Sequence, residues 1–247
     1  MRFYITGGTG YLGSELRRLR PDALAQRVEV RDARAVRQLL ERLRPQVVIH
    51  TAYRQDGPDA HAINVDGSGN VAAAAAAVGA RLLHLSTDVV FDGRKGAPYL
   101  EDDEPRPVTE YGRSKADAEA AVVAAHPDAL LVRTSLLLGG RRGPASKHEL
   151  AARDPAFTFY ADERRSPVQV GDLARALLEL AELSVTGPLH VAGADSLSRA
   201  ELAELVTGRP VRRAPAPPDR PLDCSLDSSR AQAMIRTRLR GARELYA

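Results

Sequence analysis

The chain has 247 residues, which suits one large domain or one domain with a smaller lobe. Hydrophobic residues make up 44% and charged residues 27%, as in an ordinary soluble protein, and no apolar run of about 18 residues suggests a membrane span. The formal net charge is only +3, and arginines are interspersed with acids, so no basic block indicates a nucleic-acid groove. The single Cys224 excludes an internal disulfide, and we expect a reducing, cytoplasmic location.

The first predicted strand runs directly into a glycine-rich turn, Gly7-Gly-Thr-Gly-Tyr-Leu-Gly13, which is followed by a helical pattern. Strand, glycine turn and helix are the context of a dinucleotide-binding fingerprint. Gly7 or Gly8 would permit the tight turn, Gly10 the close approach of a pyrophosphate, and Gly13 the packing of helix on strand. The phosphates would lie on the helix N-terminus.

A second, short strand is predicted over residues 28–32. An acid about 20 residues past the glycines would bind the ribose 2′-hydroxyl of NAD, whereas an arginine would accept the 2′-phosphate of NADP. Glu29, Asp32, Arg20 and Arg27 all compete for this place. Both cofactors therefore stay open, and the two arginines favour NADP(H) over NAD(H).

The rest of the chain predicts an α/β fold in two parts. The other predicted strands cover residues 46–52, 81–88, 129–135, 157–160, 167–170 and 189–192. The predicted helices cover residues 33–43, 60–79, 111–125, 172–183 and 199–206. Residues 1–140 indicate a Rossmann-like, doubly wound parallel sheet that binds a dinucleotide. We expect residues 141–247 to form mainly a small substrate-binding lobe, with the strand near 167–170 and the helix 172–183 returning to the sheet.

Hydroxyls and a carboxylate end the strand predicted over residues 81–88. Ligands of open α/β sheets collect at the carboxyl ends of strands, so Ser86 or Thr87 is placed to touch one. Further along, Tyr111-Gly-Arg-Ser-Lys115 sets a phenol and an ammonium one helical turn apart on one face. A nearby ammonium favours the phenolate, so the pair can exchange a proton nearer neutrality. The pair alone is weak evidence, and its weight depends on a cofactor and a cleft.

Together these segments resemble the extended short-chain dehydrogenase/reductase superfamily, and within it the dTDP-4-dehydrorhamnose reductase-like group of sugar-nucleotide ketoreductases. The similarity runs through most of the chain. The segments that carry it are Gly7-Gly-Thr-Gly-Tyr-Leu-Gly13, Arg44-Pro-Gln-Val-Val-Ile-His-Thr-Ala-Tyr53, Asn64-Val-Asp-Gly67, Ser86-Thr-Asp-Val-Val-Phe-Asp-Gly93, Tyr111-Gly-Arg-Ser-Lys115, Gly171-Asp-Leu-Ala174 and Pro221-Leu-Asp-Cys-Ser-Leu-Asp227.

The resemblance implies a role for each matching residue. Tyr111 would be the general acid, and Lys115 would bind the nicotinamide ribose and lower the pKa of the tyrosine. Thr87 would hydrogen-bond the substrate carbonyl, and Asn64 would orient the Lys115 side of a proton relay. The implied cofactor-binding residues are Gly7, Gly10, Tyr11, Leu12, Gly13, Glu29, Val30, Thr51, Ala52, Tyr53, Ser86, Tyr111 and Lys115. Those near the substrate are Thr87, Asp88, Val89 and Tyr111, and no residue is assigned to a metal.

Arginines after residue 140 are candidates for the diphosphate of a nucleotide sugar. Arg164 and Arg165 belong to one predicted loop, and Arg141 and Arg142 to another. A guanidinium matches phosphate with two parallel hydrogen bonds. Solvated surface arginines are an equally good interpretation in a chain this rich in arginine.

Two departures from the group's pattern bear on the substrate. The chain is short, and the missing length falls around the second strand and in the lobe. The segment after the fourth parallel strand usually carries an aromatic residue against the substrate in this group. Here Arg133-Thr-Ser-Leu-Leu-Leu-Gly139 carries leucines, and the chain has no Trp.

Three functions fit these motifs. The first is NAD(P)H-dependent reduction of a keto group on a nucleotide-linked deoxysugar, with a nucleotide-diphosphate sugar as substrate. The second is a non-catalytic NADP-binding regulatory subunit, like the β subunit of methionine adenosyltransferase. The third is a sugar-nucleotide epimerase or dehydratase of the same superfamily. The intact set of Thr87, Tyr111 and Lys115 favours the reductase, and a homodimer is one open option for its assembly.

Overall fold

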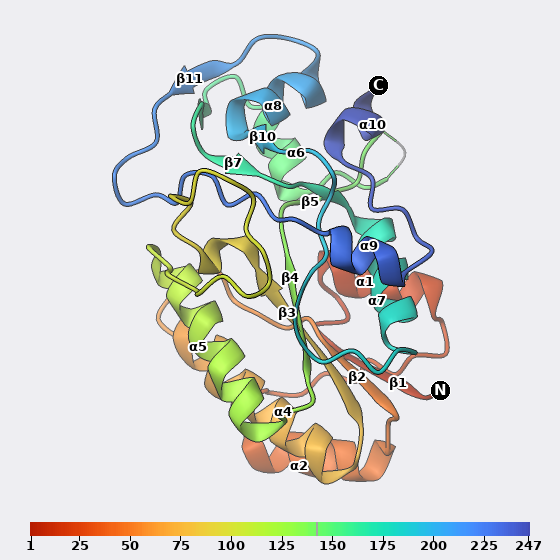
Figure 1. Cartoon of the computed structure of the whole chain (residues 1–247). Coiled ribbons are helices and arrows are strands. Elements are labelled where there is room, and N and C mark those ends of the chain that lie inside the picture. The colour runs from red at the N-terminus through yellow and green to blue at the C-terminus, as the bar shows by residue number, and fades with distance from the viewer. Residues whose placement is uncertain (142) are drawn as a thin grey trace.

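The computed structural model describes residues 1–141 and 143–247. Within these residues, the core is a parallel sheet of five strands in the order β1-β2-β3-β4-β9 (Figure 1). The strands are β1 (Phe3–Thr6), β2 (Val47–His50), β3 (Arg81–Thr87), β4 (Leu130–Thr134) and β9 (Gly187–His190). The predicted α/β class with a Rossmann-like parallel sheet is confirmed.

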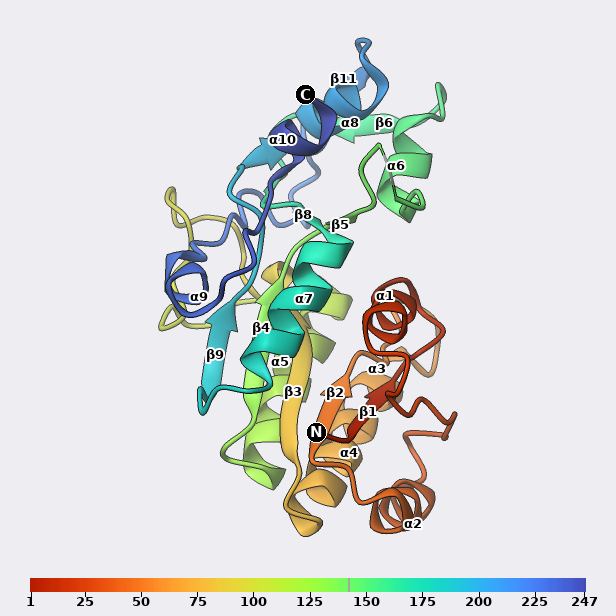
Figure 2. The same cartoon turned by 90° about the vertical axis from the view of Figure 1, so that its right-hand side faces the viewer.

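Helices cover both faces of the sheet (Figures 1 and 2). One face carries α2 (Ala33–Leu43), α4 (Asp66–Ala77) and α5 (Glu110–Ala125), and the other carries α1 (Tyr11–Leu19), α7 (Val170–Leu180) and α9 (Ser229–Met234). Successive strand side chains point to opposite faces. Phe3 and Ile5 therefore pack with the helices α1 and α7, whereas Tyr4 packs with α2 and α4.

The lobe lies above the carboxyl ends of the strands in Figure 1. Its short strands pair as β5 with β8, β7 with β10, and β6 with β11. Its elements are β5 (Leu137–Leu138), α6 (Lys147–Ala152), β6 (Thr158–Tyr160), β7 (Arg164–Arg165), β8 (Val168–Gln169), β10 (Leu197–Ser198), α8 (Arg199–Thr207), β11 (Arg212–Ala214) and α10 (Ala242–Tyr246). Helix α7, strand β9 and helix α9 return to the main sheet, so the chain crosses between the two parts repeatedly. The division at residue 140 stays a prediction.

The second strand predicted at residues 28–32 is wrong. These residues are all described, and they form no strand. The amide of Asp32 donates to the carbonyl of Glu29 at 3.1 Å, and the Asp32 carboxylate accepts from the amide of Ala35, which turns the chain into α2. Only Leu24 bridges to Tyr4. Strand β1 is consequently an edge of the sheet.

Two predicted helices have different limits in the structure. The helix predicted over residues 60–79 is two helices, α3 (Ala60–Asn64) and α4, which meet at Val65. The helix predicted to begin at Asp172 begins at Val170, because the Gln169 side chain accepts from the Asp172 amide and caps it. Asn70 lies inside α4 and donates to the carbonyl of Val30 at 3.0 Å, which explains an asparagine in a helix interior.

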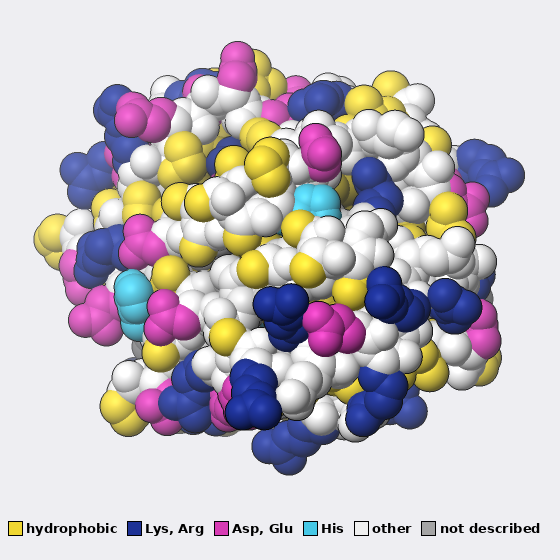
Figure 3. Space-filling model, turned by 90° about the horizontal axis from the view of Figure 1, so that it is seen from below, with side chains coloured by type: hydrophobic (Ala, Val, Ile, Leu, Met, Phe, Trp, Pro, Cys, Tyr) yellow, Lys and Arg dark blue, Asp and Glu magenta, His cyan; other side chains and the backbone are white. Residues whose placement is uncertain are grey.

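Among the described residues, no helix is both long and apolar enough to cross a membrane. Basic and acidic side chains are intermingled on the face of the molecule that Figure 3 shows. This is the interspersed pattern that the sequence predicts.

Candidate active site

The glycine turn has the geometry that a pyrophosphate needs. Gly7 has a φ of 65°, and a side chain there would meet the Ala52 amide at 2.8 Å. A Cβ on Gly13 would lie 2.2 Å from the carbonyl oxygen of Gly7, so α1 lies directly on the turn. At Gly10 the nearest atom is 3.2 Å away, and no side chain caps the first turn of α1. The free amides of this turn fit the phosphates of a dinucleotide.

The end of β2 is tied to the same turn. The Thr51 hydroxyl donates to the carbonyl of Thr6 at 2.7 Å, and the Ala52 amide donates to the Thr6 hydroxyl at 3.3 Å. Tyr53 follows and is half exposed, with its ring centroid 5.9 Å from that of Tyr111. The residues predicted around the cofactor at β1 and β2 thus form one surface that leads to Tyr111.

Four other predicted cofactor residues contact other residues of the chain. Leu12 belongs to the hydrophobic core, and Val30 packs against Gly67. The Tyr11 hydroxyl donates to the carbonyl of Pro144 at 2.7 Å. Glu29 forms an ion pair with the Arg31 guanidinium at 2.9 Å, whose hydrogen bonds lower the pKa of Glu29 to about 2.

Tyr111 is held beside Thr87 by close packing of α5. Thr109 caps α5, its hydroxyl accepting from the Gly112 amide at 3.0 Å. A Cβ on Gly112 would lie 2.3 Å from the carbonyl oxygen of Val89, so only glycine allows α5 to approach the short 3₁₀ helix η1 (Asp88–Val90). Burial raises the pKa of Tyr111, the charges of Tyr53 and Asp88 raise it further, and the hydrogen bond from Thr87 opposes them. The phenol thus keeps its proton and can donate it.

Lys115 and Asn64 both form hydrogen bonds with the backbone near the active site. The Lys115 ammonium donates to the carbonyl of Leu85 at 2.6 Å and lies 3.3 Å from Nε2 of His84. Burial is the largest influence on the pKa of Tyr111 and raises it, and Lys115 is not among the groups that shift it. Asn64 is buried and bonds to the backbone of Arg54 at 2.8 Å, not to Lys115.

Asn64 also donates to the Ser114 hydroxyl at 2.9 Å and so fixes α5 from its other side. Ser86 likewise points into the protein, where its hydroxyl donates to Glu119. Glu119 in turn accepts from Arg133 at 2.8 Å, and both side chains are about 5% exposed. The structure therefore brings together Tyr111 and Thr87 and gives Asn64 and Ser86 supporting contacts.

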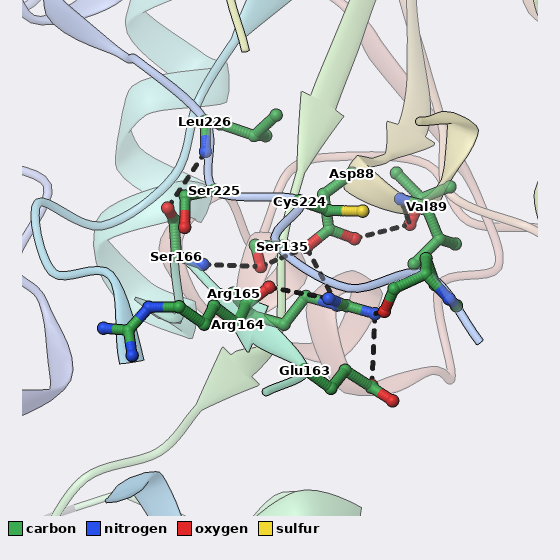
Figure 4. Close-up of polar contacts among 12 residues, drawn as sticks. Asp88, Val89, Ser135, Glu163, Arg164, Arg165, Ser166, Cys224, Ser225 and Leu226 are labelled. Atoms are coloured by element: carbon green, nitrogen blue, oxygen red, sulfur yellow. Dashed lines mark hydrogen bonds and ion pairs between the residues drawn. The ribbon is translucent and has the colours of Figure 1, made fainter. Parts of the chain in front are cut away.

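Asp88 contacts Ser135 and the lobe residue Arg165 (Figure 4). Its carboxylate accepts from the Ser135 hydroxyl and lies 3.7 Å from Nε of Arg165. Arg165 is 2% exposed and also pairs with Glu163 at 3.1 Å, and Glu163 pairs with Arg220 at 2.9 Å. Burial raises the pKa of Asp88, and the charge of Arg165 opposes this. We call Asp88, Glu163, Arg165 and Arg220 the ion cluster.

The phosphate role predicted for Arg164 and Arg165 is not supported by this geometry. Arg165 is enclosed in the ion cluster, and Arg164 donates to the carbonyl of Ser196 at 2.7 Å and pairs with Glu201 at 3.1 Å. Their loop is strand β7. Of the other predicted pair, Arg141 donates to the carbonyl of Tyr246 at 2.6 Å, and Arg142 lies outside the described residues.

A basic group that the sequence analysis missed lies between the lobe and the loop after β2. Both terminal nitrogens of half-buried Arg199 lie 3.4 Å from Nδ1 of His148, and no carboxylate among the described residues pairs with this guanidinium. Burial lowers the pKa of Arg199 to about 10, so it stays charged. Lys147 donates to Gln55, two residues past Tyr53. The signal available was the pair of Ser caps, Ser146 and Ser198, each followed directly by a basic residue.

The model of one protein family, described as the RmlD substrate binding domain, matches residues 1–245. The chain belongs to this family. It is 39% identical to dTDP-4-dehydrorhamnose reductase of Mycolicibacterium smegmatis over 276 residues, covering 98% of this chain and 83% of that one. It is also 31% identical to methionine adenosyltransferase 2 subunit beta of Pongo abelii over 276 residues, covering 91% and 80%. The resemblance drawn from the motifs is confirmed.

Solved structures of the RmlD family have the same fold. A dTDP-4-dehydrorhamnose reductase of Bacillus anthracis, in complex with NADP, matches with a TM-score of 0.86 and 26% identity over 99% of this chain and 96% of that one. A hypothetical dTDP-4-dehydrorhamnose reductase of Sulfolobus tokodaii matches with a TM-score of 0.84 and 31% identity over 97% of both chains. The fold of the RmlD family thus extends over the lobe as well as the sheet.

Proposed function

We propose that this protein reduces the keto group of a nucleotide-linked deoxysugar with NADP(H). The observation that carries the proposal is the protonated phenol of Tyr111 beside the Thr87 hydroxyl, at the strand edge that leads from the glycine turn. Carbonyl reduction needs a hydride on one side and a proton on the other. The nicotinamide supplies the hydride, and the protein supplies position and proton.

Each residue then has one task. The Thr87 hydroxyl orients the carbonyl oxygen, and the Tyr111 phenol gives that oxygen its proton. Lys115 lies one turn beyond Tyr111, where its remaining N–H can meet the nicotinamide ribose. Gly10 leaves the room that the pyrophosphate fills at the start of α1.

The preference for NADP(H) over NAD(H) rests on Arg27. The Arg20 guanidinium lies over the Phe3 ring at 4.6 Å and donates to the carbonyl of Met1, at the amino end of β1 and away from the glycine turn. Arg27 is exposed on the segment that passes the turn. The B. anthracis relative binds NADP. Equal dissociation constants of NADPH and NADH by calorimetry would refute the preference.

Arg199 and Lys147 are proposed to hold the diphosphate of the substrate. Both are cationic, and they lie at the junction between the lobe and the loop that carries Tyr53. A half-buried guanidinium without a carboxylate is stabilised by an anionic ligand. This replaces the phosphate role predicted for Arg164 and Arg165.

The test is absorbance at 340 nm with NADPH and a panel of 4-keto sugar nucleotides. Turnover of at least one member is expected. The related β subunit of methionine adenosyltransferase makes a regulatory role the second candidate. Tight NADPH binding, no turnover and co-purification with another enzyme would favour that second role. The buried, free Cys224 fits the cytoplasmic location that we propose.

A further inference from the structure

A row of buried polar side chains crosses the sheet below the cofactor edge. Thr6, His50 and His84 are register partners on β1, β2 and β3. Both ring nitrogens of His50 are bonded, Nδ1 to the Thr6 hydroxyl at 2.6 Å and Nε2 to the Ser68 hydroxyl at 3.0 Å. The His50 and His84 ring centroids are 5.3 Å apart. We call Thr6, His50 and His84 the histidine row.

Lys115 of α5 contacts the histidine row at His84. Its ammonium contacts two neutral groups, Nε2 of His84 at 3.3 Å and the carbonyl of Leu85 at 2.6 Å. Glu119, on the next turn of α5, raises the Lys115 pKa by its charge, but its carboxylate is engaged by Arg133 and Ser86. Within the described residues, no carboxylate pairs with Lys115 directly. The charged form of this lysine, which is 2% exposed, therefore depends on neutral acceptors.

An ammonium has three N–H donors. Nε2 of His84 and the carbonyl of Leu85 accept two of these N–H groups. The third can donate to a ligand or to a group near Tyr111. His84 can accept only while Nε2 is unprotonated. Burial and the neighbouring charges of Lys115 and His50 hold the pKa of His84 well below its ordinary value, which keeps the ring neutral. The second ring nitrogen, Nδ1, is buried with no partner in the described part of the chain. Contact with Lys115 is thus the one hydrogen bond that the structure gives the His84 ring.

We propose that His84 is a positioning residue, which holds the Lys115 ammonium protonated and aims its remaining N–H at the cofactor side. Asn64 donates to the Arg54 carbonyl and the Ser114 hydroxyl, whereas His84 contacts the Lys115 ammonium itself. Only the kinetic part of the test rests on the proposed reductase function.

The first measurement needs no substrate. The chain has three lysines, Lys95, Lys115 and Lys147, so lysine Cε-labelled protein gives three NMR signals, and Lys115→Met identifies one of them. Burial lowers the pKa of Lys115 to about 8. A neutral acceptor stabilises the ammonium, so His84→Leu should lower this titration by roughly one to two pH units, equivalent to one hydrogen bond to a charged group. His84→Gln keeps an acceptor and should restore it.

The second measurement is the pH profile of kcat/KM. The parent should lose activity above about pH 8 as the Lys115 ammonium loses its proton, and His84→Leu should lose it at correspondingly lower pH. The matched control is exposed His61→Leu, which should leave both profiles in place. An unchanged Lys115 titration in folded His84→Leu would overturn the inference. A shifted titration in a protein without turnover would support it and count against the reductase function alone.

Discussion

On the lobe side of Thr87 the ion cluster pairs its charges directly, whereas on the α5 side the Lys115 ammonium contacts neutral groups, one turn from the Glu119–Arg133 pair. The ion cluster joins Asp88, Glu163, Arg165 and Arg220 with separations of 2.9–3.7 Å. Lys115 is as deeply buried as Arg165, each 2% exposed, yet among the described residues its ammonium contacts only His84 and the carbonyl of Leu85. Burial lowers the pKa of the lysine to about 8.

The ion cluster has the contacts of a structural element, and Lys115 has those of a reactive group. Charges that are paired and buried are hard to change, because loss of one partner leaves the other uncompensated. A buried ammonium with neutral acceptors can lose its proton, or exchange an acceptor for a ligand, over a small free-energy range. The ion cluster thus fixes the position of the lobe on one side of the active site. On the other side, the protonation and the contacts of Lys115 can change.

The largest expected effect is that of Tyr111→Phe. This substitution removes the proton donor and changes neither the ion cluster nor the contacts of Lys115. General acid catalysis contributes about 10²–10⁴-fold. We expect kcat to fall by that order, roughly 3–5 kcal/mol of barrier, while calorimetric NADPH affinity stays at the parent value. Tyr160→Phe, on β6, is the matched control. A parent-like kcat in Tyr111→Phe would exclude this phenol as the acid.

Arg165→Met tests the paired side. It leaves Asp88 and Glu163 buried beside an apolar side chain, and loss of one partner of a buried pair lowers stability by about 3–5 kcal/mol. Urea denaturation should show this loss. Exposed Arg212→Met should change stability by less than about 0.5 kcal/mol. A loss equal to that of the control would mean that the ion cluster does not hold the lobe.

Gly10→Val tests the glycine turn. A Cβ on Gly10 would lie 3.2 Å from the carbonyl oxygen of Gly7, so that oxygen must shift slightly, and thermal unfolding of the variant checks that the fold is kept. The added methyls fill the space assigned to the pyrophosphate, and NADPH affinity should fall at least about a hundredfold, near 2.7 kcal/mol. Gly69→Ala in α4, with 3.6 Å of clearance, is the control. Parent-like affinity in Gly10→Val would move the phosphates elsewhere.

The smallest expected effect concerns Arg199. A hydrogen bond to a charged group contributes about 1.5–3 kcal/mol, so Arg199→Met should raise KM for a nucleotide sugar by roughly ten- to a hundredfold with little change in kcat. Arg164→Ala serves as the comparison, because that arginine is engaged by Ser196 and Glu201. If Arg164→Ala raises KM and Arg199→Met does not, the original assignment of the phosphate site is the better one.

Local sequence patterns predicted the parts of the site that depend on neighbours in sequence. Gly13 is fixed by its approach to Gly7 within one turn, and Tyr111 and Lys115 are placed by helical spacing. Such constraints are visible in a short string of residues. The α/β class followed from the same kind of information, namely apolar runs and helical periodicity.

Local sequence patterns could not predict contacts between residues that are distant in sequence. Arg165 was predicted to bind phosphate because its carboxylate partner Asp88, 77 positions earlier in the sequence, meets it only in the folded chain. Arg199 was overlooked for the converse reason, because only the folded chain shows that no carboxylate of the described residues pairs with it. The strand predicted at residues 28–32 failed because Asp32 turns the backbone into α2 before it can pair with β1.

The order β1-β2-β3-β4-β9 also has a consequence for synthesis of the chain. Each strand is added beside the one made before it, so the sheet can grow from one edge as the polypeptide leaves the ribosome. No strand made later among the described residues has to be inserted between two that have already paired. The segments that follow β4 are the exception. After the chain has entered the lobe, α7 and β9 must return to a sheet whose first four strands are already made. We therefore expect a folding intermediate in which β1 to β4 are paired, the lobe is not yet folded, and the ion pair between Asp88 and Arg165 has not formed.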